Sequence, residues 1–405
     1  MPTLLTRNRL ILNQPQGRYL LNDDFTFDLP AGALAGSFAY PGPGRRVFVR
    51  DTGARMSISG GAVTIANSVN TGDPGIWFDQ LNRRAGVVLI GVLTPTASSM
   101  ELGWDNDNAS GVRDGFRLSS SLTLRVDGGT LVVGATVLST AYTVAVIMRA
   151  TGIMWLIKGG AFTSWTLLWI SATFSYAPYP AIASGGAATS ATVDAIRWIN
   201  PSLAWLPAPL ASDGFGSTFG TTDGLGHAEG AEGGIGSGGS GVAYTTVGTW
   251  VNSGGIATTS ALSGGFALAY TTLATADVVI TTKVTRAGGD AGLVLRFTDT
   301  SNHITCHHNG TNVILLKKVA GTGTTVQSTA ATYVAGAELR VVAEATKFRV
   351  YYNNALVGSE QTIADAALQS PQNVGLYTTN TGNQFDDLVI WARGTGGEYA
   401  ALDAF

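Results

Sequence analysis

Charge and cysteine are both scarce in this 405-residue sequence. Only 13% of its residues are charged, and 24 Lys and Arg against 27 Asp and Glu leave a net charge of −3. The sequence therefore lacks the basic excess that binding to a nucleic acid backbone requires, and we predict no nucleic acid partner. Its single cysteine, Cys306, excludes an intramolecular disulfide and any zinc or iron–sulfur site built from several thiolates.

Long apolar runs are also missing. The longest, residues 87–93, is far shorter than the roughly 20 residues that cross a bilayer as a helix. Residues 1–22 contain three arginines and no continuous apolar segment, so they do not resemble a secretory signal. We predict no membrane partner and interpret residues 1–22 as an N-terminal arm, which either docks on a neighbour or forms a first edge strand.

Helical periodicity is nearly absent from the sequence. Apolar residues instead alternate or form short runs, as at 278–280, 293–297 and 348–352, between clusters of Gly, Asn, Asp, Ser and Thr. A hydrophobic content of 45% is too high for intrinsic disorder. These patterns predict an all-β chain made of antiparallel β-sandwich domains.

One sequence pattern occurs twice, about 190 residues apart. Four pairs of segments correspond: 23–25 with 213–215, 56–62 with 250–256, 85–90 with 275–280, and 193–198 with 385–391. The repeat predicts two tandem domains, residues 23–200 and 213–394. We interpret residues 201–212, which contain three prolines, as an extended connector, residues 229–241 as a glycine-rich surface loop, and residues 395–405 as a C-terminal tail.

The order of these landmarks resembles the concanavalin A-like and laminin-G-like jelly-roll superfamily. The signals that carry the resemblance in the second copy are residues 213–215, 250–255, 291–299, 353–354, 374–377 and 385–389. The resemblance implies two stacked antiparallel sheets in each domain, with the first and last strands of a domain side by side.

This arrangement makes four acidic residues candidates for metal binding. Adjacent first and last strands would bring Asp23 near Asp194 and Asp213 near Asp386. By resemblance to sandwich domains that bind calcium near their ends, each pair is a calcium candidate, although calcium takes six or more oxygen ligands. No other cofactor is expected.

Two polar stretches are candidates for catalytic or metal sites. Hydrolases of the superfamily show Glu-x-Asp-x-x-Glu; here the nearest pair is Glu101 and Asp105, which would share one face of a strand. His303, Cys306, His307 and His308 would divide between two strand faces, which favours ordinary strand residues over a zinc site or a Cys–His nucleophile. We therefore predict that the protein is not an enzyme.

Two tryptophans are candidates for glycan contacts. Most of the nine tryptophans lie in strand patterns and are expected to pack in the core. Trp77 follows the turn at residues 73–75, and Trp104 precedes the oxygen-rich loop that starts at Asp105, so both are expected near exposed turns. Trp77, Trp104 and Asp105 are the predicted ligand-binding residues, and the loop itself is either an Asx-rich turn or a calcium ligand set.

The superfamily includes carbohydrate-binding modules, adhesion modules, some glycoside hydrolases and surface components of tailed phages, and fold alone does not choose among them. A tandem pair without an enzyme signature looks most like the phage group. The first hypothesis is therefore a structural protein of the virion, made in the host cytoplasm. It would act as a capsid decoration or tail component, assembled with itself and other virion proteins through sheet edges and the N-terminal arm. The alternative is a carbohydrate-binding adhesion module that recognises a host polysaccharide, with or without calcium.

Overall fold

The computed structural model describes residues 19–23, 25, 30, 46–51, 54–65, 75–78, 87–96, 99–105, 112–149, 152–171, 179–185, 191–199, 209–215, 244–252 and 255–404. The chain divides into two compact units. The first consists of residues 1–206 and 397–405, and the second of residues 207–396. Most of the N-terminal arm, the glycine-rich loop and most of the connector fall outside the described residues.

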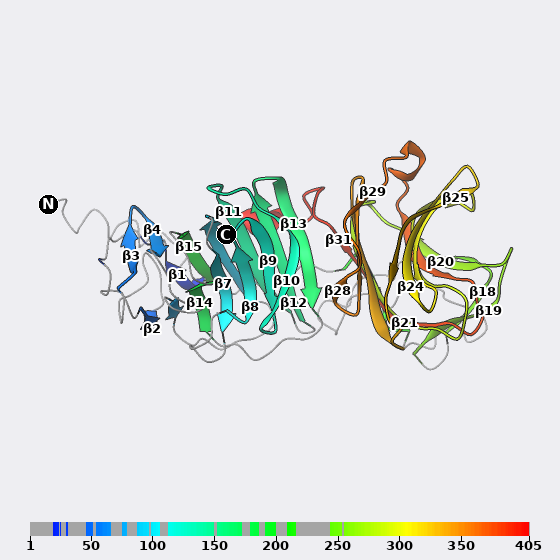
Figure 1. Ribbon diagram of the computed structural model, residues 1–405, viewed down its shortest axis with the longest axis horizontal. Helices are drawn as coiled ribbons and strands as arrows, with labels where there is room; N and C mark the ends of the chain where they lie inside the picture. Colours follow the sequence, from blue (N-terminus) through cyan, green and yellow to red (C-terminus); the bar gives the residue numbers. More distant parts are fainter. Residues whose placement is uncertain are drawn as a thin grey trace. The chain divides into compact units, whose positions relative to one another are not determined.

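The first unit contains two antiparallel sheets (Figure 1). One has the order β13-β12-β11-β6-β15-β4-β3 with β1 added on β15, and the other the order β10-β9-β8-β7-β14-β5-β2. The strands of the first sheet are β1 (Tyr19–Asp23), β3 (Met56–Ser59), β4 (Ala62–Ile65), β6 (Val88–Thr94), β11 (Tyr142–Arg149), β12 (Gly152–Gly159), β13 (Phe162–Ser171) and β15 (Ala191–Ile199). Those of the second are β2 (Arg46–Arg50), β5 (Gly75–Phe78), β7 (Met100–Asp105), β8 (Asp114–Leu118), β9 (Ser121–Val126), β10 (Gly129–Ala135) and β14 (Tyr179–Ser184).

The second unit also contains two antiparallel sheets. One has the order β18-β19-β31-β21-β26-β27-β28, with β16 on β31 and β29 on β27, and the other the order β17-β20-β30-β22-β23-β24-β25. The strands of the first are β16 (Ala211–Asp213), β18 (Thr249–Asn252), β19 (Ala257–Ala261), β21 (Val278–Thr285), β26 (Ala337–Glu344), β27 (Lys347–Tyr352), β28 (Ala355–Leu356), β29 (Gln361–Thr362) and β31 (Gln384–Ala392). Those of the second are β17 (Thr245–Val247), β20 (Ala267–Thr272), β22 (Ala291–Asp299), β23 (Asn302–His308), β24 (Asn312–Val319), β25 (Thr322–Ala330) and β30 (Asn373–Thr378).

The strand order of the first unit is repeated in the second. The sheet β10-β9-β8-β7-β14-β5-β2 corresponds strand for strand to β25-β24-β23-β22-β30-β20-β17, and the opposite sheets match in the same way apart from β29, which has no counterpart among the described strands of the first unit. Small details recur too: Phe25 and Phe215 are both buried and both have positive φ, 53° and 51°, which is uncommon for a residue other than glycine. The duplicated sequence pattern therefore corresponds to a duplicated topology.

The all-β jelly-roll prediction is confirmed. In the second unit one core cluster joins residues of both sheets, such as Ile280 and Val341 from one and Leu293 and Leu376 from the other, so the two sheets pack face to face. The first and last strands pair in both units, β1 with β15 and β16 with β31, as the resemblance implied. Among the described residues, no helix is long and apolar enough to cross a membrane.

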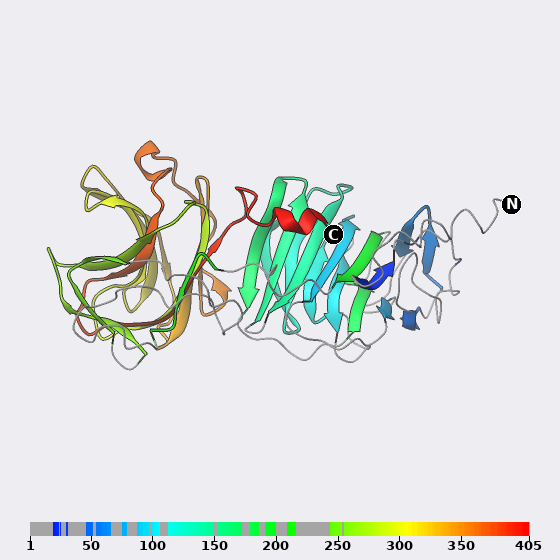
Figure 2. The same ribbon diagram turned by 180° about the vertical axis from the view of Figure 1, so that it is seen from behind.

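The C-terminal segment returns to the first unit. Its 3-10 helix η4 (Ala400–Ala404) contacts β13 (Figure 2). Tyr399 and Leu402 are buried. The Asp403 carboxylate accepts hydrogen bonds from Lys158 Nζ at 2.7 Å and from Trp165 Nε1 at 2.9 Å. Residues 397–405, which belong to the stretch interpreted from the sequence as a tail, are therefore part of the folded first unit.

Candidate functional site

The two tryptophans predicted to contact a glycan are buried. Trp104 lies within β7, where it alternates with polar neighbours and faces the core, and Trp77 lies in β5. Neither ring has exposed surface: Trp77 packs with Val112 and Ala181, and its Nε1 donates to Asp105 Oδ2 at 2.6 Å. The expectation of exposed turn aromatics was wrong, because both rings sit inside strands where packing covers them.

Asp105 and Glu101 form a buried polar layer on the outer face of β7. Glu101 Oε1 accepts a hydrogen bond from Arg117 Nε at 2.8 Å, and its Oε2 accepts one from Val112 N at 2.9 Å. Burial raises the pKa of Glu101 despite the attraction of Arg117 and Arg125. Neither carboxylate has exposed surface. The Glu101 carboxylate therefore fixes the backbone at Val112, and the Asp105 carboxylate fixes the Trp77 ring.

The four acidic residues predicted to bind calcium each have a different local environment. Asp213 Oδ1 accepts from Phe215 N at 2.8 Å, which closes the turn that gives Phe215 its positive φ. Burial raises the pKa of Asp386, and the neighbouring Asp387 adds to the shift. Asp194 is half-buried, and burial raises its pKa as well. The side chain of Asp23 lies outside the described residues, although its backbone pairs with Ile196.

Within the described residues, no three His, Cys, Asp or Glu side chains come close enough to hold a metal ion. Calcium at the two acidic pairs therefore stays a prediction.

The histidine-rich strand β23 divides between two faces, as its sequence predicts. Cys306 and His308 point toward the core side, where His308 Nδ1 accepts from Gly310 N at 2.8 Å. Burial strongly raises the pKa of Cys306. His303 and His307 lie on the opposite, outer face of the sheet, and burial lowers the pKa of both below the ordinary histidine value.

An aromatic cluster covers this outer face, and sequence reasoning did not identify it. The Phe297 ring lies 4.7 Å from Tyr270 and 5.8 Å from His303, centroid to centroid. Farther along the sheet His307 lies 5.5 Å from Tyr377. These rings come from four strands, β20, β22, β23 and β30, so only the strand order brings them together.

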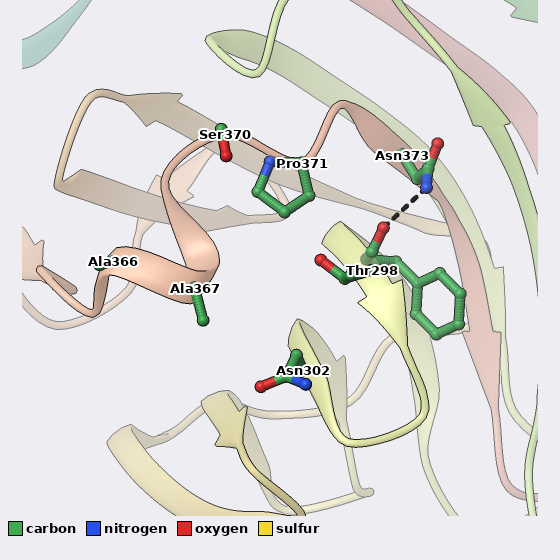
Figure 3. Close-up of a pocket in the computed structure, with 8 residues that line it drawn as sticks. Thr298, Asn302, Ala366, Ala367, Ser370, Pro371 and Asn373 are labelled. Atoms are coloured by element: carbon green, nitrogen blue, oxygen red, sulfur yellow. Dashed lines mark hydrogen bonds between the residues drawn. The ribbon is translucent and has the colours of Figure 1, made fainter.

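A pocket of about 470 Å³ opens at one end of this cluster. It lies between the 3-10 helix η3 (Ala366–Leu368), the ends of β22 and β23, and the start of β30 (Figure 3). Its lining residues are small, amide-bearing, hydroxyl-bearing or apolar: Phe297, Thr298, Asn302, Ala366, Ala367, Ser370, Pro371 and Asn373. None of these eight residues is charged, so the pocket suits a neutral ligand.

Hydrogen bonds hold the two strand-borne walls of the pocket. Asn373 Nδ2 donates to Phe297 O at 2.7 Å, and Thr272 Oγ1 donates to Asn373 Oδ1 at 2.6 Å. Asn302 Nδ2 donates to the Asp299 carboxylate, the nearer oxygen at 3.1 Å. The amides that face the pocket are thus oriented before any ligand arrives.

The third wall, at η3, is held from beneath by a buried arginine. Arg296 has no exposed side-chain surface, and its Nη1 donates to Leu368 O at 3.1 Å and to Gln369 Oε1 at 3.0 Å. Its Nη2 contacts Asp277 Oδ1 at 3.2 Å. Arg296 sits at an irregularity in the β22–β23 pairing with φ of 50°, which is how a residue of a regular strand reaches under the loop.

Comparison with known proteins shows similarity of fold alone. No protein-family model and no curated protein matches the sequence. Among solved structures, the carbohydrate-binding module CBM66 from Bacillus subtilis is 18% identical, covering 37% of this chain and 95% of the module with a TM-score of 0.31. The VIP36 exoplasmic/lumenal domain in its Ca²⁺/Man2-bound form is 10% identical over 36% of this chain and 79% of that domain, with a TM-score of 0.31. Sheep galectin-11 in complex with glycerol is 16% identical over 30% of this chain and 93% of its own, with a TM-score of 0.24.

Proposed function

We propose that this chain is a non-enzymatic carbohydrate-binding protein, and that the second unit holds a neutral sugar in the pocket between η3 and the β22–β23 hairpin. The observation that carries the proposal is the chemistry of the lining. Hydroxyl and amide groups of Thr298, Asn302, Ser370 and Asn373 face the same space as the apolar surface of Pro371. Sugars present hydroxyls at their ring edges and C–H groups on their ring faces, so they match both kinds of wall.

Size and rigidity support the same ligand class. A volume of about 470 Å³ lies within the roughly 300–1,000 Å³ typical of small-molecule sites. The walls are already braced by Arg296 and Asn373, so little conformational entropy is lost on binding. Because no carboxylate lines the pocket, sugar binding there is expected to persist in the presence of a calcium chelator.

Isothermal titration with a panel of neutral mono- and disaccharides tests the proposal. Ala367 is exposed and lines the pocket, whereas Ala364 is exposed three residues earlier and does not. We expect Ala367→Arg to fill the pocket and weaken sugar binding at least tenfold, and the matched Ala364→Arg to bind as the unchanged chain does. Binding that Ala367→Arg leaves intact would place the sugar elsewhere, and no binding across the panel would reject the proposal.

The structural role in a phage virion stays a prediction from the sequence. It makes a different forecast in the same experiments: no sugar binding, and specific association with a capsid or tail protein. Hydrolysis is separated by prolonged incubation with polysaccharide, because a binding protein leaves the chain length of the polymer unchanged.

A further inference from the structure

The turn between β23 and β24 contains Asn309 followed by Gly310, the one Asn–Gly pair of the sequence. In such a pair the glycine nitrogen can attack the side-chain carbon of the asparagine and close a five-membered ring, because glycine has no Cβ in the way. Glycine is required at position 310. Its φ is 108°, and a Cβ there would lie 2.6 Å from the Arg286 guanidinium.

A histidine lies at the Gly310 amide as a potential base. Gly310 N donates a hydrogen bond to His308 Nδ1 at 2.8 Å. The other ring nitrogen, Nε2, lies 3.2 Å from Ala331 O, which can only accept, so Nε2 carries the proton and Nδ1 keeps its lone pair. Burial lowers the pKa of His308, which favours this form of the ring. A nucleophile bonded to a base, with the base oriented by a third group, is the arrangement that activates nucleophiles.

A cation polarises the peptide group between Asn309 and Gly310. Arg286 Nη2 donates to Asn309 O at 2.7 Å. Resonance in the peptide unit moves the charge of a deprotonated nitrogen onto this oxygen, so a guanidinium bonded to it makes the Gly310 N–H more acidic. The base and the cation therefore act on the same peptide group, one at its nitrogen and the other at its oxygen.

The side-chain oxygen of Asn309 is surrounded by donors. Oδ1 accepts hydrogen bonds from Asn312 N at 2.8 Å, from Thr311 N at 3.0 Å and from Thr311 Oγ1 at 3.1 Å. Attack on Cγ puts negative charge on this oxygen, and two backbone N–H groups at these distances stabilise such an oxyanion. Among the described residues Asn309 Nδ2 has no hydrogen bond, so nothing there holds the leaving group.

We propose that Asn309 is a self-modification site, at which His308 promotes attack of Gly310 N on Asn309 Cγ and ammonia is released. The Gly310 amide proton passes to His308 Nδ1 as the N–Cγ bond forms. The Cγ–Nδ2 bond then breaks, and His308 gives the same proton to the departing amine. Water opens the resulting imide at either carbonyl, which leaves an aspartate or an isoaspartate at position 309. No oxidant or cofactor takes part, and His308 is regenerated.

The fold closes the matching hairpin of the first unit without an Asn–Gly pair. There β8 and β9 are joined by Ser119 and Ser120. Thr136 N donates to Ser120 O, as Ala331 N donates to Thr311 O in the second unit, so both turns bond to the residue that follows the last strand of the sheet. The Asn–Gly pair is therefore not a condition of the fold, and neither is its setting of base, cation and donors.

Peptide mapping by mass spectrometry on the full chain, incubated at neutral pH, tests this inference. We expect the peptide that contains residue 309 to gain one dalton and to separate into aspartate and isoaspartate forms. His308→Gln keeps a side chain that can accept from Gly310 N but is not a base. It should slow the conversion at least ~10-fold, because general acid–base catalysis supplies roughly 10²–10⁴-fold.

Thr381→Gly supplies a matched control within the same chain. It creates a second Asn–Gly pair at Asn380, whose Oδ1 already accepts from Gly382 N at 2.8 Å. Within the described parts of the chain no histidine bonds to the amide that follows Asn380. The control pair should therefore convert at least ~10-fold more slowly than Asn309, again by the loss of acid–base catalysis.

Three results would overturn the inference: an Asn309 that converts no faster than the control pair, an equal rate in His308→Gln, or faster conversion in the urea-denatured chain than in the folded one. Denaturation removes base, cation and donors together, so the last comparison decides even if His308→Gln fails to fold. Equal thermal unfolding shows that a variant remains folded. The sugar pocket lies at the other end of β23, at Asn302, and its titration is read separately.

Discussion

The C-terminal segment offers the sharpest test of how the first unit is stabilised. Trp165 is almost fully buried, and its indole Nε1 donates to the Asp403 carboxylate at 2.9 Å. Asp403→Ala removes that acceptor and leaves a buried donor without a partner, which costs about 1–3 kcal/mol. The ion pair with Lys158 adds little, because the two side chains are 35% and 50% exposed and such pairs contribute roughly 0–1 kcal/mol.

The expected loss is therefore about 1–3 kcal/mol in the free energy of unfolding of the first unit. For a domain near 200 residues this lowers the melting temperature by roughly 2–12 °C. Seven of the nine tryptophans lie within residues 1–206, so tryptophan fluorescence mainly follows that unit while calorimetry follows both. We expect Asp403→Ala to shift the transition seen by fluorescence and to leave the other transition in place.

Asp403→Asn is the matched control, because it keeps an oxygen for Trp165 Nε1 and removes only the charge. Its expected loss is below about 1 kcal/mol. Leu402→Ala should cost more than either, about 2–5 kcal/mol, because the side chain is buried. If Asp403→Ala left the fluorescence transition unchanged, or shifted only the other one, the segment would not be part of the first unit and the reasoning would fail.

Three further predictions concern the second unit. Gly375→Ala should destabilise it by about 1–3 kcal/mol in chemical denaturation, because the added Cβ would overlap the Ala269 carbonyl oxygen, whereas Gly323→Ala, with its nearest neighbour 4.0 Å away, should be nearly neutral. Cys306 is buried with its pKa raised, so a thiol reagent at pH 8 should label it only after denaturant is added; rapid labelling of the native chain would contradict its burial. Burial lowers the pKa of His307 below 6.5, so the unfolded state binds its proton first and stability should fall as pH drops below 6.5 toward the folded pKa. Because burial also lowers the pKa of His303 and His308, His307→Gln should reduce that slope without removing it, and an unchanged slope would assign it to the other groups.

Local sequence pattern was sufficient to predict the strands and their duplication. Alternation such as Leu339, Val341 and Ala343 matches one buried face of β26, and the repeat offset matches the shared strand order. The packing of the C-terminal segment against the first unit was not predictable in this way. It depends on Tyr399 and Leu402 finding a surface more than 200 residues away, and two apolar residues in a short segment do not specify that surface.

The candidate site was missed for a related reason. Its walls come from three separate segments, residues 297–302, 366–371 and 373, and none of them carries a motif that marks a ligand. Trp77 and Trp104 are close to turns in the sequence, and a tryptophan near a turn suggests an exposed ring. The burial of Trp77 depends on Val112 and Ala181 packing against its ring, and that of Trp104 on the strand register that turns it toward the core; both are long-range features that single-sequence reasoning does not reach.

Duplication supplies an internal comparison that separates what the fold requires from what it leaves free. Features present in both units, such as the positive φ at Phe25 and Phe215, are conditions of the fold.

Counted from the matched hairpins, the ion pair of Glu101 and Arg117 corresponds to Val294 and Thr305, so a charged pair in one unit is replaced by two buried, uncharged residues in the other. In the last strand of the same sheet, the first unit has Val132 where the second unit has Thr325. The two sheets therefore diverged at both their outer face and their edge.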